Sequence, residues 1–299
     1  MSKDKFQAKV ILTIGISNCG KSTWVKDFVK NNPMYSDINR DDIRVALFCN
    51  SNINEYVNYK FTDDKECLVS SVQKSYADYA VSKGQGVVIS DTNLNPKVRA
   101  TWKEYAKEKG LPYEEQVFDV PLHVCSSRNR KRNYTVPDRV LRSQYLSYRA
   151  FKGIPTYIGT AGKPRAIIID VDGTLADMTG VRKPFEWSLV SGDKPRAEIC
   201  ELARMYRDAG YTIIIMSGRD GVCYEDTAKW LIENDVPFMH LYLREPGDQR
   251  PDAVFKEECF WANVADNYDV KLVLDDRTQM VDQWRAMGLQ CLQVQPGDF

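Results

Sequence analysis

The sequence has few of the residues on which several common kinds of active site depend. Its 299 residues include only two histidines, His123 and His240, which argues against a histidine-centred triad or a His-rich metal site. Eight scattered cysteines form no Cys-x-x-Cys pair, so they predict reduced thiols rather than disulfides or zinc ligands. No apolar run approaches a membrane span, and the N-terminus lacks a signal-peptide core. We therefore expect a cytoplasmic protein without membrane contact, in which any metal is a hard cation held by carboxylates.

The formal net charge is zero, but the charge is unevenly distributed along the chain. Residues 1–152 carry 25 Lys and Arg against 17 Asp and Glu, a net charge of +8. Residues 153–299 carry 16 against 24, a net charge of −8. A basic half favours a polyanionic partner and an acidic half favours a carboxylate metal site, although two solvated surfaces of different composition would give the same numbers.

The most specific motif is Gly15-Ile-Ser-Asn-Cys-Gly-Lys-Ser22, between an apolar run and a segment with helical spacing. Strand, glycine-rich turn and helix in this order match the P-loop pattern G-x-x-x-x-G-K-[ST]. The glycines let backbone N–H groups face phosphate oxygens, the lysine reaches the β- and γ-phosphates, and the serine offers a hydroxyl to Mg²⁺. The alternative is an ordinary glycine-containing turn. The predicted residues for binding ATP or another NTP are Gly15, Gly20, Lys21, Ser22 and Thr23.

Two further strand ends carry candidate residues for a phosphoryl acceptor. Asp41 and Arg44 lie three residues apart on a predicted helix that Asn39 is placed to cap, so they share a face. A carboxylate there can take a proton from an attacking hydroxyl, and an arginine can hold an anionic acceptor. The simpler alternative is that Asp41 complements the helix dipole. Asp91 and Thr92 end another predicted strand, where they either face the acceptor or cap the turn.

The segment 122–132 is strongly basic. Arg128 and Arg132 are four residues apart and would project together from a helix. Such a helix over a P-loop acts as a lid that brings positive charge to the transferring phosphoryl group. The alternative is a solvated helix face.

A boundary is predicted at 153–164, where three glycines and two prolines interrupt the helical periodicity. The sequence therefore predicts a first domain at 1–152, a linker at 153–164 and a second α/β domain at 165–299.

The second domain opens with a buried strand that ends in Asp170-Val-Asp-Gly-Thr174. This D-x-D-G-T signature resembles the haloacid dehalogenase-like (HAD) phosphatases, which implies that Asp170 attacks phosphorus and Asp172 donates to the leaving oxygen. Later strand ends and a helix supply the partners that this family requires. They are Ser217 and Arg219 for phosphate, Lys256 to neutralise the phosphorylated aspartate, and Asp275 and Asp276, which with Asp170 and Asp172 form a Mg²⁺ site.

Four segments together resemble the bifunctional polynucleotide 5′-kinase/3′-phosphatase family of T-even bacteriophages. They are T-I-G-x-x-x-x-G-K-S-T-W, I-N-R-D-D-x-R, I-S-D-T-N-L-N-P and V-L-D-D-R-T-Q, and the similarity runs from Ile11 to Phe299. The resemblance implies two three-layer α/β domains with parallel sheets, a P-loop kinase followed by a HAD-like Rossmannoid phosphatase.

The same resemblance implies roles for individual residues. Lys21, Asp41 and Arg132 would be catalytic in the kinase, with Arg128 on the nucleotide. In the phosphatase, Asp170, Asp172 and Lys256 would be catalytic. The substrate-binding residues would be Arg44, Asp91 and Thr92 in the kinase and Ser217, Arg219, Arg182 and Asp252 in the phosphatase.

The implied function is the healing of RNA or DNA ends by 5′-phosphorylation and 3′-dephosphorylation. The implied partners are those ends, a nucleic-acid ligase and further copies of the chain in a homotetramer, in host cytoplasm if the chain is phage-encoded. Two alternatives stay open: a small-molecule kinase fused to a metabolite phosphatase, and a non-catalytic end-binding protein.

Overall fold

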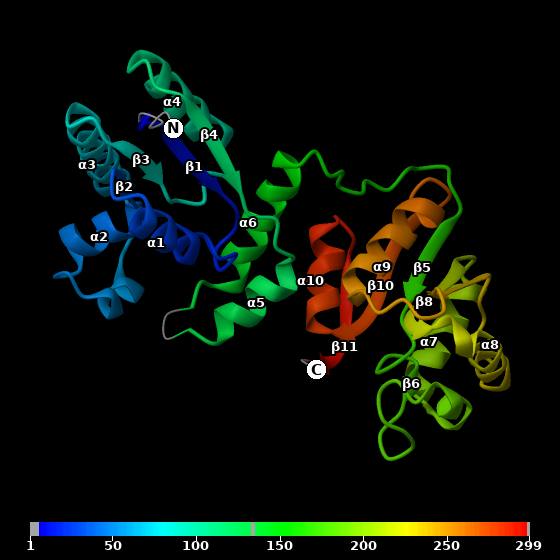
Figure 1. The fold of residues 1–299 in the computed structure, drawn as a ribbon. Coiled ribbons are helices and arrows are strands. Elements are labelled where there is room, and N and C mark those ends of the chain that lie inside the picture. The colour runs from blue at the N-terminus through cyan, green and yellow to red at the C-terminus, as the bar shows by residue number, and fades with distance from the viewer. Residues whose placement is uncertain (1–5, 133–134, 298–299) are drawn as a thin grey trace, which may run out of the picture. The chain divides into compact units, whose positions relative to one another are not determined.

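The computed structural model describes residues 6–132 and 135–297, so the last two residues of the segment that carries the resemblance lie outside it. The chain divides after Ile154 into two compact units, each with its own parallel sheet (Figure 1). This agrees with the predicted α/β class with two parallel-sheet domains.

The first unit contains a four-stranded parallel sheet in the order β2-β3-β1-β4. Its strands are β1 (Val10–Ile14), β2 (Tyr35–Ile38), β3 (Gly86–Ile89) and β4 (Tyr113–Val117). Its helices are α1 (Lys21–Asn31), α2 (Arg40–Phe48), the 3-10 helix η1 (Ile53–Asn58), α3 (Asp63–Ser82), α4 (Pro96–Glu108), α5 (Leu122–Arg130) and α6 (Asp138–Phe151).

Helices cover both faces of this sheet, which explains why β1 is buried along its whole length and apolar except at Thr13. Val10 and Leu12 pack in one core cluster with residues of α3 and α4, whereas Ile11 packs in another with Val25 and Phe28 of α1. A strand buried on both faces is a nearly continuous apolar run, and the buried Thr13 hydroxyl donates to the Asp91 carbonyl at 3.0 Å. The result is the predicted three-layer arrangement.

The second unit contains a five-stranded parallel sheet in the order β11-β10-β5-β8-β9. Its strands are β5 (Arg165–Ile169), β8 (Thr212–Asp220), β9 (His240–Arg244), β10 (Asp269–Arg277) and β11 (Cys291–Gly297), beside an antiparallel pair, β6 (Ala176–Asp177) and β7 (Lys194–Pro195). Its helices are η2 (Trp187–Gly192), α7 (Ala197–Asp208), η3 (Gly221–Cys223), α8 (Tyr224–Glu233), α9 (Asp252–Cys259), the π-helix η4 (Phe260–Val264) and α10 (Thr278–Ala286).

Part of the predicted linker is built into the second unit. Tyr157 is buried in one of its core clusters, its N–H donates to the Met287 carbonyl at 2.7 Å, and its hydroxyl donates to the Tyr268 carbonyl at 2.8 Å. The segment after Pro155 is therefore anchored to the body that follows it.

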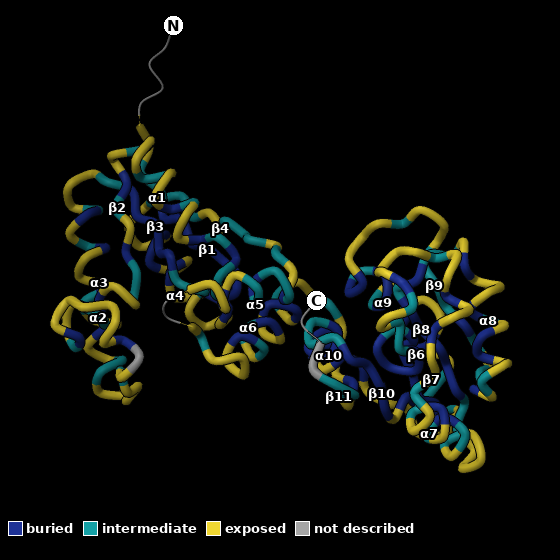
Figure 2. The backbone as a smooth tube through the Cα atoms, turned by 90° about the horizontal axis from the view of Figure 1, so that it is seen from below, coloured by how far each residue is buried: buried dark blue, intermediate teal, exposed yellow. Residues whose placement is uncertain are grey.

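The inner strands of the two large sheets are the most deeply buried segments, whereas the outward faces of the helices are exposed (Figure 2). All eight cysteines are free thiols, and seven of them are buried. None of the helices in the described part of the chain combines the length and apolar character needed to cross a bilayer. Within each sheet the strands are parallel, so their carboxyl ends meet at one edge, where ligands bind in open α/β folds.

Candidate active sites

The predicted P-loop joins β1 to α1. Gly20 has φ +103°, a conformation that strongly favours glycine, and α1 begins at the next residue. Lys21 folds its ammonium onto the loop, where Nζ donates to the carbonyls of Gly15 at 3.0 Å and Ile16 at 2.7 Å. Burial lowers the pKa of Lys21 below its usual value. The loop thus concentrates N–H groups and one buried cation at a helix N-terminus, the requirement for a phosphate site.

The basic segment after β4 lies over this loop. The Arg128 guanidinium donates to the Asn18 carbonyl at 3.2 Å, and that of Arg132 donates to Asn18 Oδ1 at 2.7 Å. Both arginines line an open cavity of about 590 Å³ on the P-loop. The predicted residues that line it are Gly20, Lys21, Ser22, Thr23, Arg128 and Arg132.

Gly15 lies deeper and does not line the cavity. A Cβ at this position would lie 2.7 Å from Cys19 Sγ, so the loop closes on itself only with glycine here. The Gly15 N–H donates to the Thr92 carbonyl at 3.2 Å. Thr92 therefore contacts the P-loop through its backbone.

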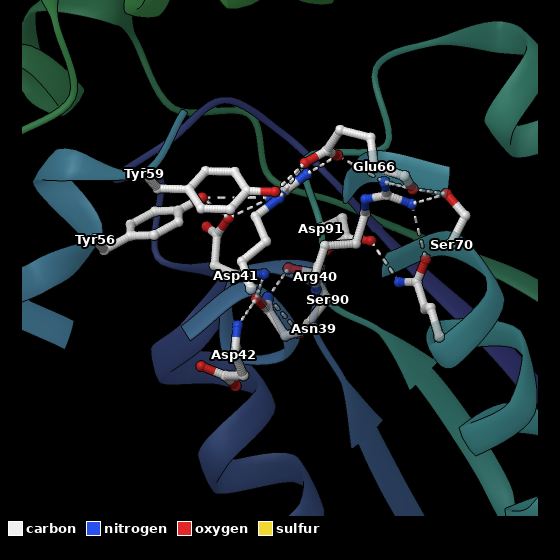
Figure 3. Close-up of polar contacts among 12 residues, drawn as sticks. Asn39, Arg40, Asp41, Asp42, Tyr56, Tyr59, Glu66, Ser70, Ser90 and Asp91 are labelled. Atoms are coloured by element: carbon white, nitrogen blue, oxygen red, sulfur yellow. Dashed lines mark hydrogen bonds and ion pairs between the residues drawn. The ribbon is translucent and has the colours of Figure 1, made fainter. Parts of the chain in front are cut away.

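Asp41 and Arg44 contact each other at the start of α2, as their spacing predicts. Asn39 caps this helix, because its Oδ1 accepts from the backbone N–H groups of Asp41 at 2.8 Å and of the next residue at 3.3 Å. Arg44 Nη1 donates to Asp41 Oδ1 at 2.6 Å, and the Tyr56 hydroxyl donates to the same oxygen at 2.6 Å (Figure 3). One carboxylate oxygen is thus fixed by two donors, while the Asp41 side chain is 58% exposed.

Glu66 of α3 is a site residue that the sequence analysis missed. Its carboxylate accepts from Arg44 Nε at 3.0 Å and Nη2 at 2.6 Å, and also from Arg40 and Tyr59 (Figure 3). The hydrogen bonds from Arg44 are the main cause that lowers the pKa of Glu66 to about 2. A two-point contact of this kind fixes the plane of the guanidinium. Glu66 therefore orients the arginine predicted to hold the acceptor.

Both carboxylate oxygens of Asp91 accept hydrogen bonds from neighbouring protein groups. Oδ1 accepts from the backbone N–H of Arg40 at 2.8 Å and Oδ2 from Gln73 Nε2 at 2.7 Å. Burial raises the pKa of this carboxyl to about 6, against the lowering effect of the two hydrogen bonds. The contacts assign Asp91 to positioning the start of α2, on which Asp41 and Arg44 lie.

In the second unit, Lys256 of α9 bridges two carboxylates at the ends of neighbouring strands. Its Nζ donates to Asp170 Oδ1 at 2.8 Å and to Asp275 Oδ2 at 3.0 Å. Burial raises the pKa of Asp170 well above its usual range, Lys256 opposes this, and Asp275 and Asp276 near the end of β10 reinforce it. The predicted nucleophile and its predicted neutralising lysine are therefore in contact.

Asp170, Asp275 and Asp276 offer oxygens that all lie within 4.8 Å of one another. Both carboxylate oxygens of Asp276 are buried and accept no hydrogen bond from any residue in the described part of the chain. Burial, and then the neighbouring Asp275, raise the pKa of Asp276 to about 6. Three clustered buried carboxylates, one of which has two unpartnered oxygens, suit a hard divalent cation such as Mg²⁺. Gly173 permits this approach, since a Cβ there would lie 2.1 Å from Asp276 Oδ2.

The group of carboxylates that lie within 4.8 Å of one another does not include Asp172, so its part in the metal site stays a prediction. Asp172 Oδ1 accepts from Arg182 Nη2 at 2.7 Å and from Arg219 Nη2 at 2.7 Å. Two positively charged guanidinium groups stabilise the ionised carboxylate, whereas further carboxylates beside it would destabilise it. Asp172 therefore lies between the two predicted phosphate-binding arginines.

Asp193, just before β7, is the second residue that the sequence analysis missed. It is buried and accepts from Arg182 Nε at 2.9 Å and from Arg219 Nη2 at 2.5 Å. No motif marks it, because it lies in a short segment between η2 and β7. It neutralises two arginines whose side chains are completely buried.

The remaining predicted residues lie at the same sheet edge. Ser217 is buried, and its Oγ accepts from the backbone N–H of Arg219 at 3.4 Å. Asp252 accepts from Arg244 Nη2 at 2.6 Å and Arg277 Nη1 at 3.0 Å. Its pKa is lowered, because attraction to Lys256 and to these arginines outweighs the raising effect of burial.

Comparison with known proteins adds family matches to this geometry. A model of an AAA domain matches residues 10–151, and a model of the polynucleotide kinase PNKP phosphatase domain matches residues 164–299. A protein of Autographa californica nuclear polyhedrosis virus, provisionally named a bifunctional polynucleotide kinase/RNA ligase, is 30% identical over 292 residues, or 94% of this chain. The chain spans 41% of that relative's length. Because the relative is baculoviral, a phage origin stays a prediction.

Solved structures with a similar fold were also found. A chain in the Pnkp1/Rnl/Hen1 RNA repair complex aligns over 99% of both chains, with 24% identity and a TM-score of 0.47. The Mycobacterium tuberculosis APS kinase CysC, in complex with AMPPNP and APS, aligns over 42% of this chain and 71% of its own, with 19% identity and a TM-score of 0.33.

The family matches confirm the resemblance that the sequence motifs predicted. Each model spans the sheet and the candidate site of one unit. Residues 10–151 thus belong to the AAA-domain family of P-loop proteins, and residues 164–299 to the family of PNKP-type polynucleotide kinase phosphatase domains.

Proposed function

We propose that this chain is a bifunctional enzyme that heals nucleic-acid ends. The observation that carries the proposal is the presence, in one chain, of a P-loop domain with a paired acid and arginine beside the loop and of a PNKP-type phosphatase domain. The first domain transfers the γ-phosphoryl group of ATP, or of another NTP, to a 5′-hydroxyl of RNA or DNA. The second removes a 3′-phosphate.

In the kinase reaction, Asp41 accepts the proton of the attacking 5′-hydroxyl, and Arg44 holds a phosphate of the acceptor strand. The exposed carboxylate and the fixed guanidinium support these roles. Lys21, Arg128 and Arg132 bind the donor phosphates and the charge that develops during transfer. Magnesium on the donor is bound with the help of the Ser22 hydroxyl.

In the phosphatase reaction, a carboxylate oxygen of Asp170 attacks phosphorus, and the bond between phosphorus and the 3′-oxygen of the strand breaks. Asp172 gives a proton to the departing oxygen and later takes one from the water that hydrolyses the aspartyl-phosphate. Arg182, Arg219 and Ser217 are available to the phosphate oxygens. Asp170, Asp275 and Asp276 would hold Mg²⁺, which would supply positive charge between two anions that otherwise repel.

The two products, a 5′-phosphate and a 3′-hydroxyl, are the ends that a ligase joins. We therefore propose a nucleic-acid ligase as the functional partner, which is supported by the RNA ligase in the relative's name. The free cysteines support a reducing compartment such as the cytoplasm. A homotetramer and a phage source rest on the family resemblance alone.

The test uses an oligonucleotide with a 5′-hydroxyl and a 3′-phosphate, incubated with γ-labelled ATP, Mg²⁺ and the protein. Gain of label at the 5′ end together with loss of the 3′-phosphate is the expected result. Loss of the 3′-phosphate without labelling would contradict the kinase half and favour the alternative of a small-molecule kinase. No change at either end would contradict the whole proposal.

A further inference from the structure

The segment between α2 and α3 brings three aromatic rings together beside the acid–arginine pair. The rings of Tyr56 and Tyr59 stack with centroids 5.6 Å apart and an interplanar angle of 28°. Figure 3 shows the two rings side by side. Tyr59 meets Phe61 at 4.9 Å and an angle of 88°. Tyr56 is buried, whereas 64% of Phe61 is exposed. The aromatic cluster thus ends in a ring, Phe61, that is exposed to solvent.

The exposed Phe61 ring contacts the proposed acceptor site through a single side chain, that of Arg44. The guanidinium carbon of Arg44 lies 5.2 Å from the centroid of the Phe61 ring. The same guanidinium donates to Asp41 Oδ1 and to both oxygens of Glu66. Phe61 therefore lies one guanidinium away from the carboxylate assigned to the 5′-hydroxyl.

The contacts of the cluster restrict the motion of its inner members. The Tyr59 hydroxyl donates to Glu66 at 2.9 Å, and Glu66 in turn holds Arg44. A surface that is ordered before its ligand arrives loses less conformational entropy on binding. This distinguishes Phe61 from an isolated apolar residue on the surface, which needs no explanation.

We propose that Phe61 is a stacking platform for a nucleobase of the acceptor strand, one of the two bases that flank the phosphate held by Arg44. The inference rests on the proposed kinase function and names the substrate class of that site. Every base offers a π-face, so stacking binds nucleic acid with little dependence on sequence. The net charge of +8 on residues 1–152 favours the same polyanionic class. A sugar or another small acceptor without a base gains nothing from this ring.

The test combines changes in the enzyme with changes in the substrate. Oligonucleotides with a 5′-hydroxyl carry either all bases or an abasic residue at the first or the second position. Phe61→Ala is expected to lower kcat/KM for the intact strand about 5- to 100-fold, the range that stacking of one base supplies, and to leave the KM for ATP unchanged. The native enzyme is expected to lose the same factor on one of the two abasic strands. Combining the variant with that strand then adds little further loss.

Two variants serve as controls. Phe61→Trp keeps an aromatic face and is expected to retain the activity on intact strands. Tyr79→Ala removes a ring of the same unit that is 67% exposed on α3, and it is expected to change nothing. The abasic strands are assayed with the native enzyme, so this result does not depend on whether any variant folds.

The proposal is overturned if the native enzyme treats both abasic strands like the intact one. It is equally overturned if Phe61→Ala lowers the activity on intact and abasic strands by the same factor, which would mean that the ring only supports Arg44. Labelling of the intact strand by the native enzyme is measured first. Failure at that step refutes the proposed kinase function, whereas failure of the coupling with labelling intact refutes only the platform.

Discussion

The ammonium of Lys256 lies 2.8 Å from Asp170 Oδ1, and both side chains are almost completely buried. The same ammonium reaches Asp275 at 3.0 Å. Desolvation opposes the charged form of each carboxylate, and the lysine compensates for it. One cation thus holds the proposed nucleophile, Asp170, beside Asp275, one of the proposed metal ligands.

Replacing Lys256 with methionine is expected to abolish 3′-phosphatase activity and to destabilise the second unit by about 3–5 kcal/mol, because two buried carboxylates lose their partner. Denaturant unfolding and an assay of 3′-phosphate release measure the two effects. Lys229→Met is the matched control, since that lysine is 69% exposed and pairs with Glu233 on the surface. Unchanged stability in Lys256→Met would refute the assigned role.

Asp193→Ala is expected to be among the most damaging single changes in the second unit. It leaves Arg182 and Arg219, both fully buried, with Asp172 as their shared carboxylate. Loss of one partner from a buried ion network costs about 3–5 kcal/mol. Asp208→Ala, which removes an acid that is 67% exposed beside Arg207, is the control for urea denaturation. A change below about 1 kcal/mol in Asp193→Ala, the size of an ordinary substitution, would contradict this prediction.

Asp41→Asn is expected to lower 5′-kinase activity about 10²- to 10⁴-fold, the usual contribution of a general base. The 3′-phosphatase activity of the same preparation should be retained, because the two sites lie on different sheets. Asp42→Asn is the matched control from the same helical turn and is expected to retain both activities. Asp170→Asn should give the converse of Asp41→Asn. Loss of both activities in a folded variant would contradict the assignment of separate sites.

Glu66→Gln removes a negative charge from the two-point contact with Arg44 and leaves the volume of the side chain nearly unchanged. We expect kcat/KM for the oligonucleotide to fall about tenfold, the effect of weakening one charge-assisted hydrogen bond. The KM for ATP should not change, because the P-loop is untouched. Steady-state kinetics with each substrate varied in turn separates the two parameters. A rise in the KM for ATP alone would assign Glu66 to the other substrate.

Asp91 predicts a pH dependence of stability with a definite sign. Its pKa rises to about 6 in the folded protein from an ordinary value of 3.8. The fold therefore favours the protonated form, and this contribution is present below pH 4 and lost as the pH rises through 6. Between these values, the free energy of unfolding of the native protein should fall relative to that of Asp91→Asn. Urea denaturation of both proteins at several pH values measures the difference, and a constant difference would show that the pKa is not raised.

The elements that carry both sites could be predicted from local patterns. The run Val10–Ile14 is buried along its whole length, and Asn39 caps α2. Each of these signals lies within a few residues of the element it determines. The catalytic motifs follow the same rule, because they lie at strand ends.

The residues that orient the catalytic groups could not be found in this way. Glu66 lies 22 residues from Arg44, and Asp193 lies 26 residues from Arg219. In the sequence, each is an acid in a polar segment, which ordinarily predicts a solvated surface. Their partners are determined by the order of the strands, which no local pattern contains. The contacts of Asp172 were not predicted for a related reason, since its carboxylate accepts from Arg182 and Arg219, which lie 10 and 47 residues further along the chain.

The contact of the Lys21 ammonium with the carbonyls of Gly15 and Ile16 has a consequence for nucleotide binding. These two carbonyl oxygens accept hydrogen bonds from the ammonium, as phosphate oxygens would. A nucleotide that binds to Lys21 must therefore replace the carbonyl oxygens with its own phosphate oxygens. The affinity for nucleotide then measures only the difference between the two sets of oxygens. In the proposed kinase, these two backbone carbonyls therefore compete with the phosphates of the donor for the one buried ammonium of the loop.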